Sequence, residues 1–193
     1  MPQTRPGRQV QFAATEHGWT GRFEAMGSPC EVLTDAGHKR EMESVMARVA
    51  AEAWRIEDKF SRYLNGNVMH RINTANGQPV EVDEETAGLI DFAATLFDIS
   101  DGRFDITSGV LRGAWTFDGG DQIPRQEAID TLMQRVGWQH ATWQQPRLTL
   151  LPGMEIDLGG FGEEYAVERW VGVARGGSDI AVVGEGGGGV GGA

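Results

Sequence analysis

Residues 154–170 constrain the fold of this chain more than any other segment, because three glycines separate a short apolar run from a helical pattern. Met154 and Ile156 alternate with polar residues, which predicts a short strand that ends at Asp157, and a helix is expected after the glycines. Glycines at such a joint let the backbone approach a ligand closely, and the N–H groups of a helix start can bind phosphate. A joint whose glycines serve only packing is the alternative.

An acidic residue stands on each side of this joint, with Asp157 before the glycines and Glu163 after them. Carboxylates repel a phosphate group unless a cation, or a sugar or amide donor, lies between the two. The segment therefore predicts a metal-assisted nucleotide site.

Charge and composition restrict the partners of the chain. It has 193 residues and a formal net charge of −11. Binding to nucleic acid or to an anionic membrane surface depends on clustered Lys and Arg, so this negative charge argues against both partners. We therefore expect no nucleic-acid partner. No apolar run reaches the ~18 residues of a membrane-spanning helix, so no transmembrane segment is expected. The single cysteine, Cys30, cannot form an internal disulfide, and we expect it to be a small buried residue.

Hydrophobic periodicity and turn residues predict an α+β domain over residues 18–184. A disordered leader is expected over residues 1–17, and a disordered Gly-rich tail over residues 185–193. Asp83 is expected to cap one helix. The other expected helices span residues 38–63, 68–74 and 124–136, and the expected strands span residues 19–24, 31–34, 80–82, 139–144 and 147–151. A turn at residues 26–29, Met-Gly-Ser-Pro, is expected to join the first two strands, and the last two are expected to form a hairpin around Gln145-Pro146.

Three motifs follow one another in a characteristic order. They are Glu24-Ala-Met-Gly-Ser-Pro-Cys-Glu-Val32, Ser100-Asp-Gly-Arg-Phe-Asp-Ile-Thr107 and Asp157-Leu-Gly-Gly-Phe-Gly162, with supporting pieces at residues 55–63, 72–75 and 79–83. Together they resemble the ApbE family of flavin transferases, the FAD:protein FMN transferases, over residues 19–184.

This resemblance implies a fold and an activity. The fold would be the N-terminal part of the ApbE-like flavin-transferase fold, with a mixed sheet and flanking helices. The activity would be the magnesium-dependent transfer of FMN from FAD to a Thr or Ser hydroxyl of an acceptor flavoprotein, with release of AMP. Such phosphoryl transfer depends on positioning and charge neutralisation. The acceptor flavoprotein is the expected partner, and a homodimer is a candidate assembly.

The resemblance also assigns site residues by position, although it assigns no catalytic residue. The residues that it assigns to FAD are Met26, Tyr63, Arg103, Phe104, Asp105, Asp157 and Glu163, and it assigns the backbone carbonyl of Gly160 to magnesium.

Several of these residues have structural alternatives. The thioether of Met26 suits a flat flavin surface, but a core methionine beside a turn is the alternative. Tyr63 would stack on a base or reach a sugar, or would simply pack at a helix end. Asp105 would accept hydrogen bonds from ribose or adenine, or would cap the turn that follows it.

The remaining magnesium ligands that the resemblance implies, an Asp pair and a Thr, lie beyond the end of this sequence. The match therefore predicts a C-terminally truncated chain, for which a non-catalytic FAD-binding module or an inactive fragment is the alternative function. Because the first residues contain neither a signal peptide nor a lipidation cysteine, a cytoplasmic location is expected.

Overall fold

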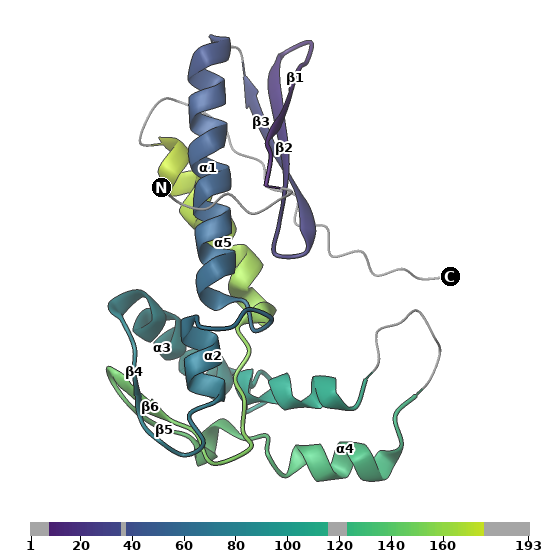
Figure 1. Cartoon of the computed structure of the whole chain (residues 1–193), viewed down its shortest axis with the longest axis vertical. Helices are drawn as coiled ribbons and strands as arrows, with labels where there is room; N and C mark the ends of the chain where they lie inside the picture. Colours follow the sequence, from purple (N-terminus) through teal and green to yellow (C-terminus); the bar gives the residue numbers. More distant parts are fainter. Residues whose placement is uncertain (1–7, 36–37, 116–122, 176–193) are drawn as a thin grey trace. The chain divides into compact units, whose positions relative to one another are not determined.

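The computed structural model describes residues 8–35, 38–115 and 123–175, and it divides into two compact units (Figure 1). Unit 1 comprises residues up to 61 together with those from 161 onward, and unit 2 comprises residues 62–160. Within the described residues, no helix has both the length and the apolar character needed to cross a membrane.

The described residues of unit 1 form a three-stranded antiparallel sheet in the order β1-β2-β3 and two helices (Figure 1). The strands are β1 (Gln11–Ala14), β2 (Gly18–Ala25) and β3 (Ser28–Asp35), and the helices are α1 (Lys39–Phe60) and α5 (Gly159–Arg175), of which all but the first two residues belong to this unit. The β2–β3 hairpin and the long helix confirm the sequence-based expectations for this region.

One apolar face of the sheet packs against both helices of unit 1. Phe23 on β2 contacts Trp54 and Trp170 edge-on, with ring centroids 6.0 and 5.8 Å apart. Steps of three and four along α1 bury one stripe of the helix, as its sequence periodicity predicts. The buried residues of this core are Phe23, Ala25, Cys30, Val32, Val45, Met46, Val49, Ala50, Ala53, Ile56, Ala166 and Trp170.

Gly21 is needed where β2 crosses α1, because a Cβ atom at this position would lie 2.3 Å from Sδ of the fully buried Met46. We expect Gly21→Ala to lower the free energy of unfolding by about 1–3 kcal/mol, the usual cost of overpacking a core. Gly88→Ala is the matched control, because its Cβ atom would meet open space on helix α3 (Glu84–Ile99). This change should raise helix stability by about 0.5–1 kcal/mol. Urea unfolding of both variants tests this pair, and equal effects would contradict the packing argument.

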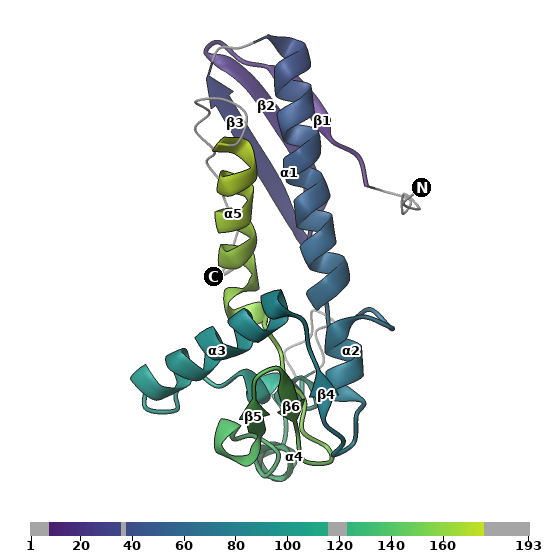
Figure 2. The ribbon, with the colours of Figure 1, turned by 90° about the vertical axis from the view of Figure 1, so that its left-hand side faces the viewer.

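The described residues of unit 2 form helices and a second three-stranded antiparallel sheet, in which β4 (Val80–Glu81), β6 (Arg147–Thr149) and β5 (Thr142–Gln144) lie side by side in that order (Figure 2). The pairing of β5 with β6 is the expected hairpin. Asp83 caps α3 by accepting a hydrogen bond from the Thr86 N–H at 3.1 Å, as predicted. The elements are α2 (Val68–Asn73), β4 (Val80–Glu81), α3 (Glu84–Ile99), η1 (Ile106–Gly113), α4 (Gln126–Met133), η2 (Trp138–His140), β5 (Thr142–Gln144) and β6 (Arg147–Thr149).

Several details of the predicted fold are wrong, among them the following two. Residues 11–14 were expected in a disordered leader, yet they pair with β2 as strand β1, and Arg8 binds Glu57 and Asp58 on α1. The sheet was expected to be mixed, whereas every strand pairing among the described residues is antiparallel and falls into two separate sheets. The α+β class is confirmed. The Gly-rich tail and residues 1–7 lie outside the described residues.

Candidate functional site

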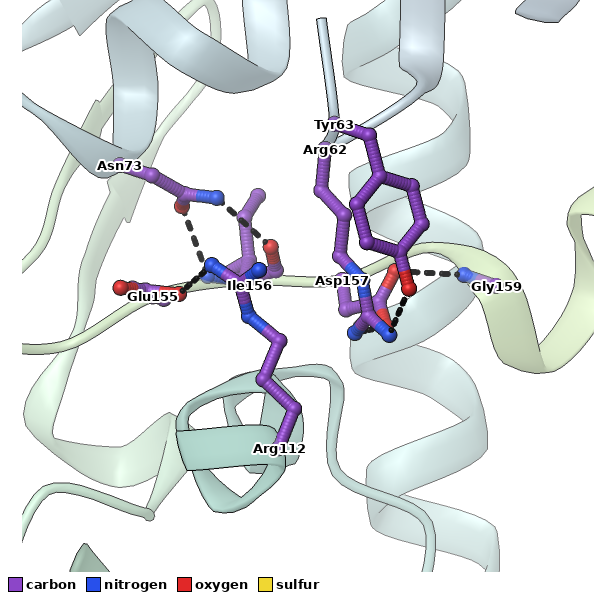
Figure 3. Close-up of polar contacts among 8 residues, drawn as sticks. All are labelled: Arg62, Tyr63, Asn73, Arg112, Glu155, Ile156, Asp157 and Gly159. Carbon is purple, nitrogen blue, oxygen red and sulfur yellow. Dashed lines mark hydrogen bonds and ion pairs between the residues drawn. The ribbon is translucent and has the colours of Figure 1, made fainter. Parts of the chain in front are cut away.

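The segment that precedes the glycine joint is not the expected strand. Its backbone bonds to a side chain instead of to another strand. The Ile156 N–H donates to Asn73 Oδ1 at 2.8 Å, and Asn73 Nδ2 donates to the Ile156 carbonyl at 3.0 Å (Figure 3). The Asp157 N–H donates to the Ile106 carbonyl at 2.8 Å. The segment is therefore held between the end of α2 and the start of η1.

The carboxylate of Asp157 contacts a backbone N–H group and an arginine, both within unit 2. Its Oδ1 accepts a hydrogen bond from the Gly159 N–H at 3.0 Å, and its Oδ2 forms an ion pair with Arg62 (Figure 3). The first contact satisfies one of the free N–H groups at the start of α5. Because each carboxylate oxygen can accept more than one hydrogen bond, Asp157 retains capacity for a hydroxyl or amide donor.

The same arginine also holds Tyr63. Nη2 of Arg62 donates to the Tyr63 hydroxyl at 2.9 Å, and the centre of its guanidinium group lies 5.0 Å from the centroid of the Tyr63 ring. Tyr63 is 74% exposed, so much of its surface remains open to a planar ligand. Arg62 therefore brings together Tyr63 and Asp157, two of the residues that the sequence predicts to contact FAD.

A second ion pair lies beside the first. Arg112 Nη2 donates to Glu155 Oε2 at 2.8 Å (Figure 3). This hydrogen bond is the largest influence on Arg112 and raises the pKa of its guanidinium group, burial opposes the rise, and the charges of Glu155, Tyr63 and Asp157 favour it. Arg112 thus lies within the electrostatic field of Asp157 and remains a cation at every relevant pH.

The predicted adenosine loop follows α3 through a left-handed turn, in which Asp101 and Gly102 have φ angles of 55° and 74°. Arg103 at this turn is exposed. Phe104 donates its N–H to Ser100 Oγ at 2.9 Å and places its ring against the glycine joint. A Cβ atom at Gly160 would lie 3.0 Å from Phe104 Cε2. Packing against Phe104 therefore explains one glycine of the joint.

Asp105 caps η1, which confirms the structural alternative for this residue. Its Oδ1 accepts hydrogen bonds from the N–H and the hydroxyl of Thr107, at 2.8 and 2.7 Å. Its Oδ2 accepts from the Trp138 N–H at 2.9 Å. The Thr107 hydroxyl in turn accepts from the Gly137 N–H at 2.7 Å. A contact between Asp105 and FAD stays a prediction.

Met26 and Glu163 belong to unit 1. Met26 and Gly27, with φ angles of 55° and 79°, form the tight turn between β2 and β3, a geometry that suits a two-residue hairpin. The Met26 N–H donates to Glu57 Oε1 at 3.1 Å, and the residue packs partly against the core of unit 1. Glu163 is half-buried on α5.

Comparison with known proteins decides the family. The family model described as the ApbE family matches residues 26–190. The chain belongs to the ApbE family.

Individual relatives of the chain support its assignment to the ApbE family. The FAD:protein FMN transferase of Chlamydia pneumoniae is 32% identical over 116 residues, or 56% of this chain and 37% of that protein. The FAD:protein FMN transferase of Escherichia coli K12 is 30% identical over 145 residues, or 70% of this chain and 40% of that protein. The crystal structure of the ApbE protein of Thermotoga maritima matches with a TM-score of 0.74 at 26% identity, covering 90% of this chain and 57% of that one. The chain thus spans well under half of these two curated relatives.

Within the described residues, the ApbE chain does not supply a metal site of its own. No group of three or more His, Cys, Asp and Glu side chains in this part of the chain could hold a metal ion. The backbone carbonyl of Gly160 would provide a single oxygen, whereas magnesium prefers near-octahedral coordination by oxygen. These residues alone therefore do not fit a bound magnesium ion.

Four residues of the site carried no role in the sequence analysis: Arg62, Asn73, Arg112 and Glu155. Two of them stand inside segments that carry the resemblance to the ApbE family, because Arg62 precedes Tyr63 and Asn73 lies in residues 72–75. The position of Arg62 and Asn73 within these segments could have identified them as candidate site residues. Arg112 and Glu155 have no such signal, because their pairing joins positions 43 residues apart.

Cys30 in unit 1 is buried, as expected. Burial raises the pKa of its thiol above the usual 9.0, a backbone hydrogen bond from Ala25 opposes the rise, and the charges of Glu163 and Glu57 add to it. The folded state therefore favours the neutral thiol. The stability contributed by this raised pKa should be complete below about pH 8 and should be lost as the pH rises from there through the folded pKa.

We therefore expect the stability of the wild-type protein to fall more steeply than that of Cys30→Ala between about pH 8 and about pH 11. Urea unfolding at stepped pH values measures both slopes. Taking the difference between the two proteins removes the contribution of other groups that titrate in this range. Parallel curves would show that the thiol has the same pKa in the folded and unfolded states.

Proposed function

We propose that this chain carries the FAD-binding part of a FAD:protein FMN transferase. Membership of the ApbE family supports the proposal, and one observation within the site carries it. Arg62 joins Tyr63 and Asp157, which come from segments 94 residues apart in the sequence and which the family resemblance separately assigns to FAD. A purely structural ion pair would have no need to include an aromatic ring that is 74% exposed.

The side chains of this site offer complementary contacts to a dinucleotide. The exposed ring of Tyr63 would stack on a planar ring of FAD. Asp157 would accept a hydrogen bond from a ribose hydroxyl or an amide of the ligand. Arg112 would supply positive charge toward the pyrophosphate. These three residues bind and orient the ligand in this proposal.

The reaction that the proposal assigns to the complete site is a phosphoryl transfer. An acceptor Thr or Ser hydroxyl oxygen bonds to the phosphorus of the FMN moiety, and the bond from that phosphorus to the bridging oxygen breaks. AMP leaves with that oxygen, and the hydroxyl proton is released. Magnesium dependence and AMP release rest on the family resemblance, and no step is assigned to magnesium because the described residues do not fit it.

Fluorescence titration of FAD with the purified 193-residue chain tests the binding part of the proposal. We expect saturable quenching of flavin fluorescence. The titration is carried out in parallel with magnesium and with a chelator. Circular dichroism establishes that the chain is folded under the same conditions. A folded chain that shows no saturation with FAD in either condition would overturn the proposal.

Transfer is tested separately, by incubating the chain with FAD and an acceptor flavoprotein. A covalent flavin on the acceptor, seen as gel fluorescence, together with AMP in equal amount supports the transferase function. FAD binding without either product, with and without magnesium, would instead identify a non-catalytic FAD-binding module.

A further inference from the structure

We propose that Arg62 is the positioning residue of this site. It holds the ring of Tyr63 and the carboxylate of Asp157 in one fixed arrangement, and it does so without binding a phosphate group of the ligand itself. The inference rests on the proposed function, because it concerns how the FAD site is assembled. None of the family assignments given above includes Arg62.

The geometry of the guanidinium group supports this role. Its Nη1 faces Asp157 Oδ2, its Nη2 donates to the Tyr63 hydroxyl, and its plane lies near the Tyr63 ring. A guanidinium group is a rigid planar fork, so two partners bound to its two Nη atoms are fixed relative to each other. Lysine carries a point charge and cannot hold both partners in this way.

The backbone N–H and the Oδ1 atom of Asp157 already have hydrogen-bond partners in the protein. Its N–H donates to the Ile106 carbonyl, and its Oδ1 accepts from the Gly159 N–H. The contact with Arg62 therefore sets the direction of a carboxylate whose backbone is held in place. Tyr63 is 74% exposed, so its ring is covered little by packing, and the contact with Arg62 limits its side-chain freedom.

The exposure of the two arginines argues against a direct phosphate contact by Arg62. The side chain of Arg62 is 19% exposed and both of its Nη atoms face protein partners, whereas the side chain of Arg112 is 37% exposed. Arg112 is therefore the better candidate for electrostatic attraction of the pyrophosphate. The role left to Arg62 is to set the positions of its two neighbours.

A double-mutant cycle on FAD affinity tests this role. We expect Arg62→Ala and Asp157→Asn each to weaken binding about 10-fold or more, and the double variant to bind no more than about 3-fold more weakly than the weaker single variant, because both changes break the same arrangement. Losses that multiply in the double variant would show that Arg62 contributes an independent contact, and they would overturn the proposal.

Two further variants distinguish positioning from simple charge. Arg62→Lys should bind FAD within about 3-fold of Arg62→Ala, because the fork is lost although the charge is kept. Affinity restored by lysine would indicate an electrostatic role. Arg71→Ala is the matched control, since it removes an exposed arginine of the same unit, and it should leave affinity unchanged. All variants should keep the far-UV circular dichroism of the wild type.

A readout without FAD separates this inference from the proposed function. The chain has two tyrosines, Tyr63 and Tyr165, so selective labelling gives two sets of ring resonances in NMR spectra. We expect Asp157→Asn to shift the Tyr63 resonances when Arg62 is present and to leave them unchanged in the Arg62→Ala background, with Tyr165 unmoved. Equal shifts in both backgrounds would overturn the positioning role. A folded wild type that fails to bind FAD would overturn the proposed function only.

Discussion

Replacement of Asp105 by alanine is expected to lower the free energy of unfolding of unit 2 by about 3–5 kcal/mol. The carboxylate accepts three hydrogen bonds, two from Thr107 and one from the Trp138 N–H. Thr107 is completely buried, so its hydroxyl finds little water to replace the lost partner. The same change removes the cap of η1, which contains the residues that follow Asp105. Urea unfolding monitored by circular dichroism measures the loss.

Asp98→Ala is the matched control for this change, because Asp98 is an exposed aspartate near the end of α3. It should alter the free energy of unfolding by no more than about 0.5 kcal/mol. Equal stabilities of the two variants would contradict the structural role of Asp105. The comparison is also needed to interpret binding data, because unfolded Asp105→Ala protein would lose FAD affinity whether or not Asp105 contacts FAD.

Thr107→Val then separates structure from ligand contact at the same place. It keeps the Asp105 carboxylate but removes the hydroxyl that donates to Asp105 and accepts from the Gly137 N–H. We expect a loss of about 1–3 kcal/mol, smaller than that of Asp105→Ala. If Asp105 contacts FAD, the folded Thr107→Val protein should retain FAD binding at low temperature, whereas folded Asp105→Ala should not.

Local patterns were sufficient to predict most helices and hairpins of this chain. The β2–β3 hairpin follows from two alternating segments around a Met-Gly turn, and α1 follows from apolar residues three and four positions apart. The Asp83 cap follows from an acceptor placed before a helical pattern. Each of these signals lies within a few residues of the element that it predicts, which is the range over which periodicity and capping act.

Such local patterns could not predict strand β1 or the path of residues 154–158. All four residues of β1 are exposed, so the strand shows no buried alternation, and it exists because its backbone pairs with β2. Residues 154–156 show the alternation of a strand, yet Asn73 takes the position of a partner strand. Arg62 and Asp157 likewise meet across 95 residues. Hydrogen bonds between distant side chains leave no periodic trace in one sequence.

Asn73→Asp is expected to destabilise the backbone that positions Asp157 in the candidate site. The Asn73 side chain donates to the Ile156 carbonyl and accepts from the Ile156 N–H. Aspartate keeps the acceptor but replaces the donor with a second carboxylate oxygen, which would face the carbonyl oxygen and repel it. Ile156 is 1% exposed, so water cannot readily separate the two. We expect a loss of about 2–4 kcal/mol in the free energy of unfolding of unit 2.

Asn73→Ala should cost less than Asn73→Asp, because it leaves two unpaired backbone groups but introduces no buried charge. The exposed Asn65→Ala is the control for loss of an asparagine in the same unit, and it should change stability by no more than about 0.5 kcal/mol. Urea unfolding gives the order of the three variants. Because Ile156 directly precedes Asp157, the Asn73 variants that remain folded should also bind FAD more weakly than Asn65→Ala. An Asn73→Asp protein as stable as the wild type would mean that the backbone of residues 154–158 is held by contacts other than this amide.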